Sequence, residues 1–261
     1  MAAAFASSSA QSTRHPKISQ PTADRPKTSA PDLLQHYNTA RTFGIGGDAA
    51  RAASEYRLFL SEALGRIANG YSREGKWPSA VAMFNEGIGL EPDSAQVRLD
   101  YGNELFKHDD LGGAKQQAQK IVELSQSNSN AQYLLGRCLY EEGNYEGAKA
   151  HLEAAVKAGE GQAGFAVGYD LARTYLKLKD INRASVVFDE MTLGYGDTAK
   201  LHIYFGYAYL MSGVYDRAIP EFKRALEKDP KIKGAHYLLG LSYLSKDEDK
   251  GWDENAAVDR A

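Results

Sequence analysis

Residues 199–230 read AKLHIYFGYAYLMSGVYDRAIPEFKRALEKDP and show the clearest periodic pattern in the chain. Apolar residues first recur at helical spacing, at Phe205, Gly206 and Tyr209, and Gly213 then interrupts the helix. A second helical stripe follows and ends at a proline; it consists of Tyr215, Ala218, Phe222 and Ala225, with Pro230 after it. The pattern predicts two helices joined by a tight turn, which is a helical hairpin.

The same pattern recurs along the chain. Small residues repeat in steps of 34, 34, 36, 34 and 34 residues, at Ala68, Gly102, Gly136, Ala172, Gly206 and Gly240. A second series lies twelve residues behind the first, at Ala80, Ala114, Ala148, Ala184 and Ala218. Both series share the one longer step, so they mark a single repeat with one insertion. Because one hairpin cannot bury its apolar face alone, the copies are expected to stack into a solenoid.

Each repeat also carries local signals for its second helix. A side chain able to cap the helix precedes it in four places, at Asp48, Asp110, Asn144 and Asp180. Such side chains accept hydrogen bonds from the free amides of the first helical turn. The small residues allow the two helices of a hairpin to approach closely where they cross.

Helix pairs of 34 residues with these small, aromatic and terminal proline positions resemble tetratricopeptide repeats. The resemblance implies an all-α, right-handed superhelix of stacked antiparallel helix pairs over residues 32–245. Five full repeats are expected to begin near Ser61, Ala95, Ser129, Phe165 and Ala199. A truncated last repeat begins near Lys233, and a divergent first one begins near Leu33. The matching small residue of this first repeat, Ala40, stands only 28 residues before Ala68. The second helix of the first repeat should therefore run on into the next repeat with little or no loop.

The two ends differ from the repeats. Residues 1–31 are rich in Ala and Ser, hold four of the eight prolines and are predicted to be disordered. Ala4-Phe5-Ala6 before three serines resembles the cleavage end of a secretory signal, but the basic and apolar regions of a signal are missing. The sequence as written predicts a cytoplasmic protein; a start further upstream would predict an exported or periplasmic one. Residues 246–261 form an acidic tail of net charge -3.

The composition argues against several classes of function. The net charge is -3, from 31 basic and 34 acidic residues, which gives no electrostatic case for binding nucleic acid or an anionic membrane. No apolar run approaches the roughly 18 residues of a membrane-spanning helix. The single cysteine, Cys138, excludes an intrachain disulfide framework and a multi-cysteine zinc site.

The sequence predicts neither an enzyme nor a metal or cofactor site. Three of the six histidines, His36, His202 and His236, occupy the same position of first helices in different repeats, and are therefore expected to be packing residues. Residues 159–164, GEGQAG, formally match a nucleotide-binding motif but follow a helix instead of a strand. They are expected to form a lengthened loop between repeats.

The resemblance places candidate binding residues in a concave groove lined by the first helices. The groove residues are Asn69, Arg73, Asn103, Lys107, Arg137, Tyr140, Tyr169, Arg173, Tyr204 and Tyr207. Asparagine amides could bind a peptide backbone, and Arg137 and Arg173 could grip carboxylates in bidentate fashion. The alternative is that these are solvated side chains paired with Asp100 and Asp170. Some members of the family bind the C-terminal carboxylate of chaperones through a clamp of Lys and Asn side chains. At the matching positions of this chain only Asn69 fits, which argues against a chaperone-binding role.

The last predicted helix, residues 234–245, is apolar almost all round. Its candidate assembly residues are Tyr237, Leu238, Leu241 and Leu244, which would meet a second copy of the chain, a partner or further sequence. The sequence thus favours a non-enzymatic scaffold or adaptor that binds a protein or peptide partner. Two alternatives are a substrate-positioning region of a larger enzyme or membrane-associated assembly, and a chain that only self-assembles.

Overall fold

The structure is a computed structural model that describes residues 30–159 and 164–249. These residues form twelve helices and no strand, which confirms the all-α prediction. The helices are α1 (Ala30–Ile45), α2 (Ala49–Arg73), α3 (Trp77–Leu90), α4 (Ala95–Lys107), α5 (Leu111–Leu124), α6 (Ser129–Glu141), α7 (Tyr145–Ala158), α8 (Phe165–Lys177), α9 (Ile181–Tyr195), α10 (Ala199–Leu210), α11 (Tyr215–Lys228) and α12 (Ala235–Asp249). The signal-like stretch, most of the GEGQAG segment and most of the acidic tail lie outside the described residues.

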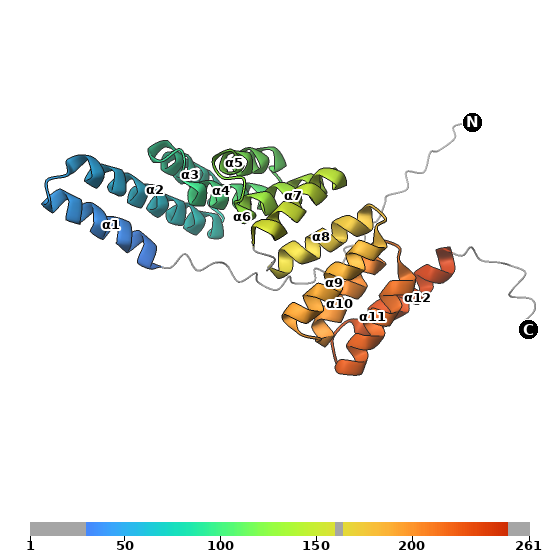
Figure 1. The fold of residues 1–261 in the computed structure, drawn as a ribbon. Coiled ribbons are helices and arrows are strands. Elements are labelled where there is room, and N and C mark those ends of the chain that lie inside the picture. Colours follow the sequence, from blue (N-terminus) through green and yellow to red (C-terminus); the bar gives the residue numbers. More distant parts are fainter. Residues whose placement is uncertain (1–29, 160–163, 250–261) are drawn as a thin grey trace, which may run out of the picture.

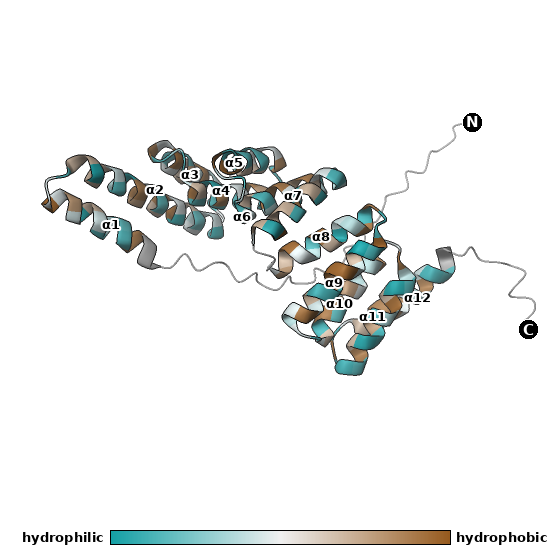
Figure 2. Ribbon diagram, in the orientation of Figure 1, coloured by the Kyte–Doolittle hydropathy of each residue, from teal (hydrophilic) through white to brown (hydrophobic). Residues whose placement is uncertain are grey.

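Consecutive helices pack as hairpins, and the hairpins stack in chain order from α1 to α12 (Figure 1). The first helices of successive repeats, α4, α6, α8 and α10, also contact one another directly. Teal and brown residues mix along the helices in Figure 2, as expected of amphipathic helices with one buried side. The chain is therefore a helical solenoid with two layers, one of first helices and one of second helices.

α2 is a single helix of 25 residues. Its first half packs on α1 and its second half packs on α3. No glycine or proline stands between Asp48 and Gly65, so nothing in the sequence breaks the helix between the leading repeat and the next. The expected loss of a loop at this junction is confirmed.

The small-residue ladder lies where the helices of a hairpin cross. A Cβ atom added to Gly136 would lie 2.7 Å from Cγ of Leu152, and one added to Gly206 would lie 2.7 Å from Cε1 of Phe222. Both facing side chains are completely buried. The glycines are thus required by close packing between the two helices, as the sequence predicted.

The predicted helix caps are confirmed. The side chains of Asp48, Asp110, Asn144 and Asp180 each accept a hydrogen bond from the backbone N–H three residues later. Each bond satisfies one of the free amides that open a helix.

A polar pair also joins the first and second helices of a hairpin. His202 is 4% exposed, and its ring nitrogens lie 2.6 Å from carboxylate oxygens of Glu221 and Asp197. The same 19-residue separation joins three further pairs, His36 with Glu55, Arg98 with Gln117, and Gln132 with His151. His36 and His202 are therefore part of the packing between helices. His236 differs from the prediction: it is exposed on α12, where the described residues contain no second helix to cover it.

Two boundaries differ from the sequence analysis. α1 begins at Ala30, so the last two residues of the segment expected to be disordered are helical. Pro31 fits there because the first turn of a helix needs no amide donor. α12 continues to Asp249 and includes the first residues of the expected tail, where Lys246 pairs with Asp216 on α11. Among the twelve helices of the described residues, none is long and apolar enough to cross a membrane.

Candidate functional site

Most of the predicted binding residues lie on the layer of first helices. We call the surface formed by α4, α6, α8 and α10 the first-helix face. Its central part carries two arginines at the same repeat position, Arg137 on α6 and Arg173 on α8, and both are partly exposed. Their surroundings are different, and the difference determines what each can bind.

Arg137 is held by aromatic rings. Its guanidinium carbon lies 3.9 Å from the ring centroid of Phe106 on α4 and 5.5 Å from that of Tyr133 on α6. These are cation–π contacts, which attract the charge to the ring faces and fix the side chain. Within residues 30–159 and 164–249, no carboxylate forms an ion pair with Arg137.

Arg173 is held by a carboxylate as well as by rings. Its Nη1 donates to Oδ1 of Asp170 at 3.1 Å, and its guanidinium carbon lies 4.6 Å from the ring centroid of Tyr140 on α6. Burial alone would lower the pKa of Arg173, but the negative charge of Asp170, the nearby Tyr140 and Tyr169, and the hydrogen bond to Asp170 together outweigh burial and raise that pKa. The positive charge of Arg173 is therefore permanent and already balanced.

Tyr133 links the two arginines. Its hydroxyl donates to the second oxygen of Asp170 at 2.9 Å and so joins α6 to α8. Burial, followed by the negative charge of Asp170, raises the pKa of Tyr133 well above its ordinary value. The phenol thus remains a hydrogen-bond donor at any physiological pH. One connected network, from Phe106 to Tyr140, orders this part of the first-helix face.

The face becomes aromatic and apolar toward α10. Tyr169 lies 5.8 Å from Tyr204, measured between ring centroids, and Phe165 lies 5.2 Å from the same ring. Tyr204 is 6% exposed, so the prediction that it contacts a partner is wrong: rings from α8 cover it. Tyr207 remains partly exposed and Met211 is 48% exposed, and these two side chains form an accessible apolar surface on α10.

The polar residues near α2 and α4 are largely satisfied within the protein. Nδ2 of Asn69 donates to Asp100 at 2.9 Å, and Nδ2 of Asn103 donates to the carbonyl of Leu99 at 2.9 Å. Lys107 pairs with Glu104. Asn69 pairs with Asp100 and Arg173 pairs with Asp170, so for these two residues the alternative of pairing within the protein applies. Arg73 is exposed at the end of α2.

Phe106 and Tyr133 are not among the predicted binding residues, although both rings hold Arg137. Phe106 stands 34 residues before Tyr140, so both occupy one repeat position. Both rings support an arginine from the following first helix. The repeat spacing that revealed the arginines could therefore have revealed the rings beneath them.

The predicted assembly residues on α12 separate into two groups. Tyr237 and Leu244 are each 65% exposed, and Leu241 is on the exposed side of the helix. Leu238 is only 6% exposed and belongs to the core that includes Ala225 and Ala235. The prediction that Leu238 lies on an assembly surface is therefore wrong, because that side chain faces the preceding repeat.

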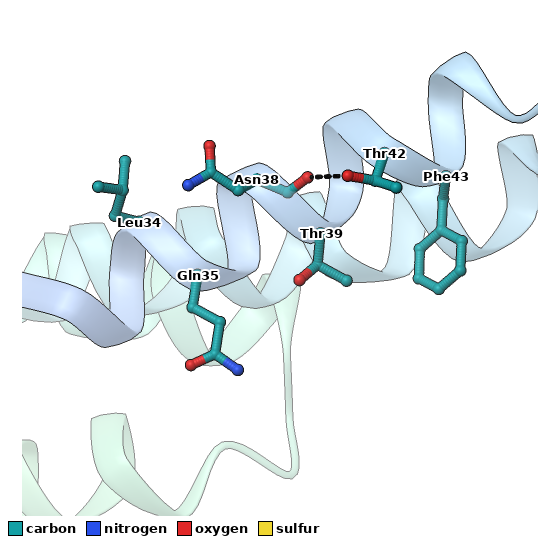
Figure 3. A pocket seen from close by; sticks show the side chains of 6 residues that line it. All are labelled: Leu34, Gln35, Asn38, Thr39, Thr42 and Phe43. Atoms are coloured by element: carbon teal, nitrogen blue, oxygen red, sulfur yellow. Dashed lines mark hydrogen bonds between the residues drawn. The ribbon is translucent and has the colours of Figure 1, made fainter.

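A shallow depression runs along α1 (Figure 3). It is lined by Leu34, Gln35, Asn38, Thr39, Thr42 and Phe43, none of which is ionisable, and it contains none of the predicted binding residues. The hydroxyl of Thr42 donates to the carbonyl of Asn38 at 2.9 Å within the same helix. The depression thus offers no group for acid–base chemistry. In the described part of the chain, no cluster of three or more His, Cys, Asp or Glu side chains could hold a metal ion.

Comparison with known proteins gives consistent results. Two tetratricopeptide repeat profiles match the chain, one at residues 105–165 and 139–202 and the other at residues 203–251. Superkiller complex protein 3 of Homo sapiens is 25% identical over 204 residues, which are 71% of this chain and 12% of that protein. The Mus musculus protein of the same name is 31% identical over 78 residues, 30% of this chain and 5% of that protein. The chain thus spans a small fraction of the length of these relatives.

Solved structures share the fold. MamA has a TM-score of 0.54 and 21% identity, over 63% of this chain and 95% of its own. PilF of Pseudomonas aeruginosa has a TM-score of 0.55 and 16% identity, over 84% of this chain and 97% of its own. Cut9, from the Cut9–Hcn1 complex, has a TM-score of 0.55 and 19% identity, over 81% of this chain and 44% of that one. The hairpin geometry, the repeat spacing and the profile matches together show that the chain belongs to the tetratricopeptide repeat family.

Proposed function

We propose that this protein is a non-enzymatic interaction scaffold that binds a segment of a partner protein on its first-helix face. The observation that carries the proposal is the network from Phe106 to Tyr140, which holds two arginines and two tyrosines in place without a partner. Arginine and tyrosine are enriched among residues that dominate binding energy. Because these side chains are already ordered, a partner loses less free energy in immobilising them.

The titratable groups support binding better than catalysis. Burial raises the pKa of the Cys138 thiol to about 11, so the reactive thiolate is scarce at neutral pH. His202 is enclosed between two carboxylates and is almost inaccessible. Both side chains therefore serve packing between helices.

A capture experiment tests the proposal. The parent chain and an Arg137→Gln/Arg173→Gln/Tyr207→Ala variant are immobilised, and proteins captured from a lysate of the source cell are compared by mass spectrometry. A matched control, Lys120→Gln/Lys157→Gln/Leu193→Ala, changes exposed side chains of the second helices α5, α7 and α9. We expect at least one protein to be captured by the parent and the control but lost with the first variant. Identical sets for all three chains would contradict the proposal.

A second candidate is that the chain serves as a repeat region within a larger assembly. It is supported by the similarity to Superkiller complex protein 3, a protein of much greater length named as part of a complex. Cross-linking in source-cell extract followed by size separation tests it. A stable high-mass species containing this chain is expected, whereas migration only at the mass of the chain would contradict it.

A further inference from the structure

We propose that Arg137 binds one acidic side chain of the partner segment, and that a large apolar side chain five or six residues away packs on Tyr207 and Met211. This inference rests on the proposed function and specifies the chemistry of the partner. It also assigns different roles to the two arginines that the sequence analysis treated alike.

Arg137 lacks the local counter-charge that Arg173 has. Arg173 has Asp170 three residues earlier on its own helix and pairs with it. The equivalent residue before Arg137 is Leu134, which is 1% exposed and lies in the core. Arg137 therefore has no carboxylate at the position from which its counterpart is neutralised.

The nearby carboxylates on the neighbouring first helices already have other partners. Glu104 on the neighbouring α4 pairs with Lys107 and accepts a hydrogen bond from Ser72, and Asp170 on α8 is bound by Arg173 and Tyr133. Glu141, one turn after Arg137 on α6, is exposed and makes no ion pair with it. The guanidinium is fixed over two rings, partly desolvated and without a counter-ion among the described residues. A carboxylate arriving from a partner would form a charge-assisted hydrogen bond without having to displace one within the protein.

The distance between Arg137 and Tyr207 sets the spacing of the two partner side chains. Arg137 on α6 and Tyr207 on α10 hold the same repeat position two first helices apart. Packed helices lie about 8–10 Å apart, so the two sites are separated by roughly 16–20 Å. An extended chain advances about 3.3–3.6 Å per residue, which corresponds to about five or six residues. Arg173 lies between the two sites and is already paired with Asp170, so an acidic residue midway along the segment would gain no comparable contact.

Synthetic peptides test the inference directly. A fluorescein-labelled twelve-residue peptide of Ser, Gly and Thr carries Glu at residue 3 and Phe at residue 8, and a second peptide has these two residues exchanged to cover both directions of binding. Matched peptides replace Glu by Gln or move Phe to three residues from Glu. Affinities for the full chain are measured by fluorescence polarisation. For one of the two peptide orders, we expect the Glu peptide to bind about tenfold more tightly than its Gln counterpart. We expect the peptide with the shortened spacing between Glu and Phe to bind more weakly.

Protein variants locate the effect. Arg137→Gln should abolish the preference for Glu over Gln, whereas Glu141→Gln should strengthen it by removing a like charge nearby. Arg51→Gln is the matched control, because Arg51 also lies over a phenylalanine ring, at 5.3 Å from Phe43, but on α2 of the leading repeat. It should leave all affinities unchanged. Circular dichroism melts confirm that each variant is folded.

The outcomes distinguish the inference from the proposed function. Equal affinities for Glu and Gln peptides, a preference that survives Arg137→Gln, or no binding of any peptide at millimolar concentration would each overturn the inference. If peptides bind equally well but Tyr207→Ala abolishes binding, the inference fails and the proposed function stands. Binding that is insensitive to both Arg137→Gln and Tyr207→Ala would contradict the proposed function as well.

Discussion

Replacing Gly206 with alanine adds one methyl group where α10 and α11 cross closely. The new Cβ atom would lie 2.7, 2.8 and 2.9 Å from three ring carbons of Phe222. That ring is fully buried in the larger core, so moving it aside would disturb its neighbours. Overpacking of this kind costs about 1–3 kcal/mol, while alanine gains about 1 kcal/mol over glycine in helix propensity. The net expectation is a loss of about 1 kcal/mol in the free energy of unfolding.

Gly240 provides the matched control. It occupies the same repeat position on α12, but a Cβ atom added there would meet nothing within 4 Å. Gly240→Ala should therefore keep the parent stability or raise it slightly. Urea unfolding followed by circular dichroism at 222 nm measures both variants, and with a slope of about 2–3 kcal/mol per molar urea the Gly206→Ala midpoint should fall by about 0.3–0.5 M. A Gly206→Ala midpoint at or above that of the parent, or equal losses in both variants, would refute the packing argument.

Three further predictions concern capping, the buried histidine and pH. Asp110→Ala should lower the free energy of unfolding by about 1 kcal/mol in urea titrations, because the first turn of α5 loses a cap, and Asp110→Asn should retain most of it; equal losses in the two variants would count against capping. His202→Leu should destabilise by about 1–3 kcal/mol, since the largely covered carboxylate of Glu221 loses its hydrogen bond to His202 and keeps only Arg224, and His202→Gln should lose less. The same urea assay measures both variants, and an unchanged midpoint for His202→Leu would contradict the expectation. Burial, together with a hydrogen bond donated to Glu153, raises the pKa of Tyr175 to about 12. Because the folded pKa is raised, the stabilisation is complete below about pH 10 and is lost as the pH rises from there toward 12. Urea midpoints between pH 8 and pH 11.5 should fall less steeply in Tyr175→Phe than in the parent; parallel slopes would disprove the assignment.

The fold could be predicted from the sequence because its determinants are local and periodic. Gly136 and Gly206 mark helix crossings, and Asp110 and Asp180 mark helix starts, at intervals that need no knowledge of distant contacts. The long α2 was also predictable, since no glycine or proline stands between Asp48 and Gly65. The helical ends at Ala30 and Asp249 were less so, because helix ends in polar sequence depend on weak local preferences.

The candidate site could be predicted only in part. Position within the repeat located Arg137 and Arg173, yet it did not show that one is neutralised and the other is not. That difference follows from a single residue three positions earlier, Asp170 or Leu134. The burial of Tyr204 could not be predicted, because it results from rings on a different helix, α8, one repeat earlier.

Site-specific photo-cross-linking tests the central claim most directly. A photoreactive amino acid replaces Tyr207 on the first-helix face in one chain and Leu193, an exposed residue of α9 on the second-helix layer, in another. Both chains are irradiated in lysate of the source cell, and cross-linked proteins are identified by mass spectrometry. Binding on the first-helix face predicts that a specific partner is cross-linked at residue 207 and is absent at residue 193. Cross-linking of the same partner at residue 193 but not at residue 207 would contradict binding on the first-helix face.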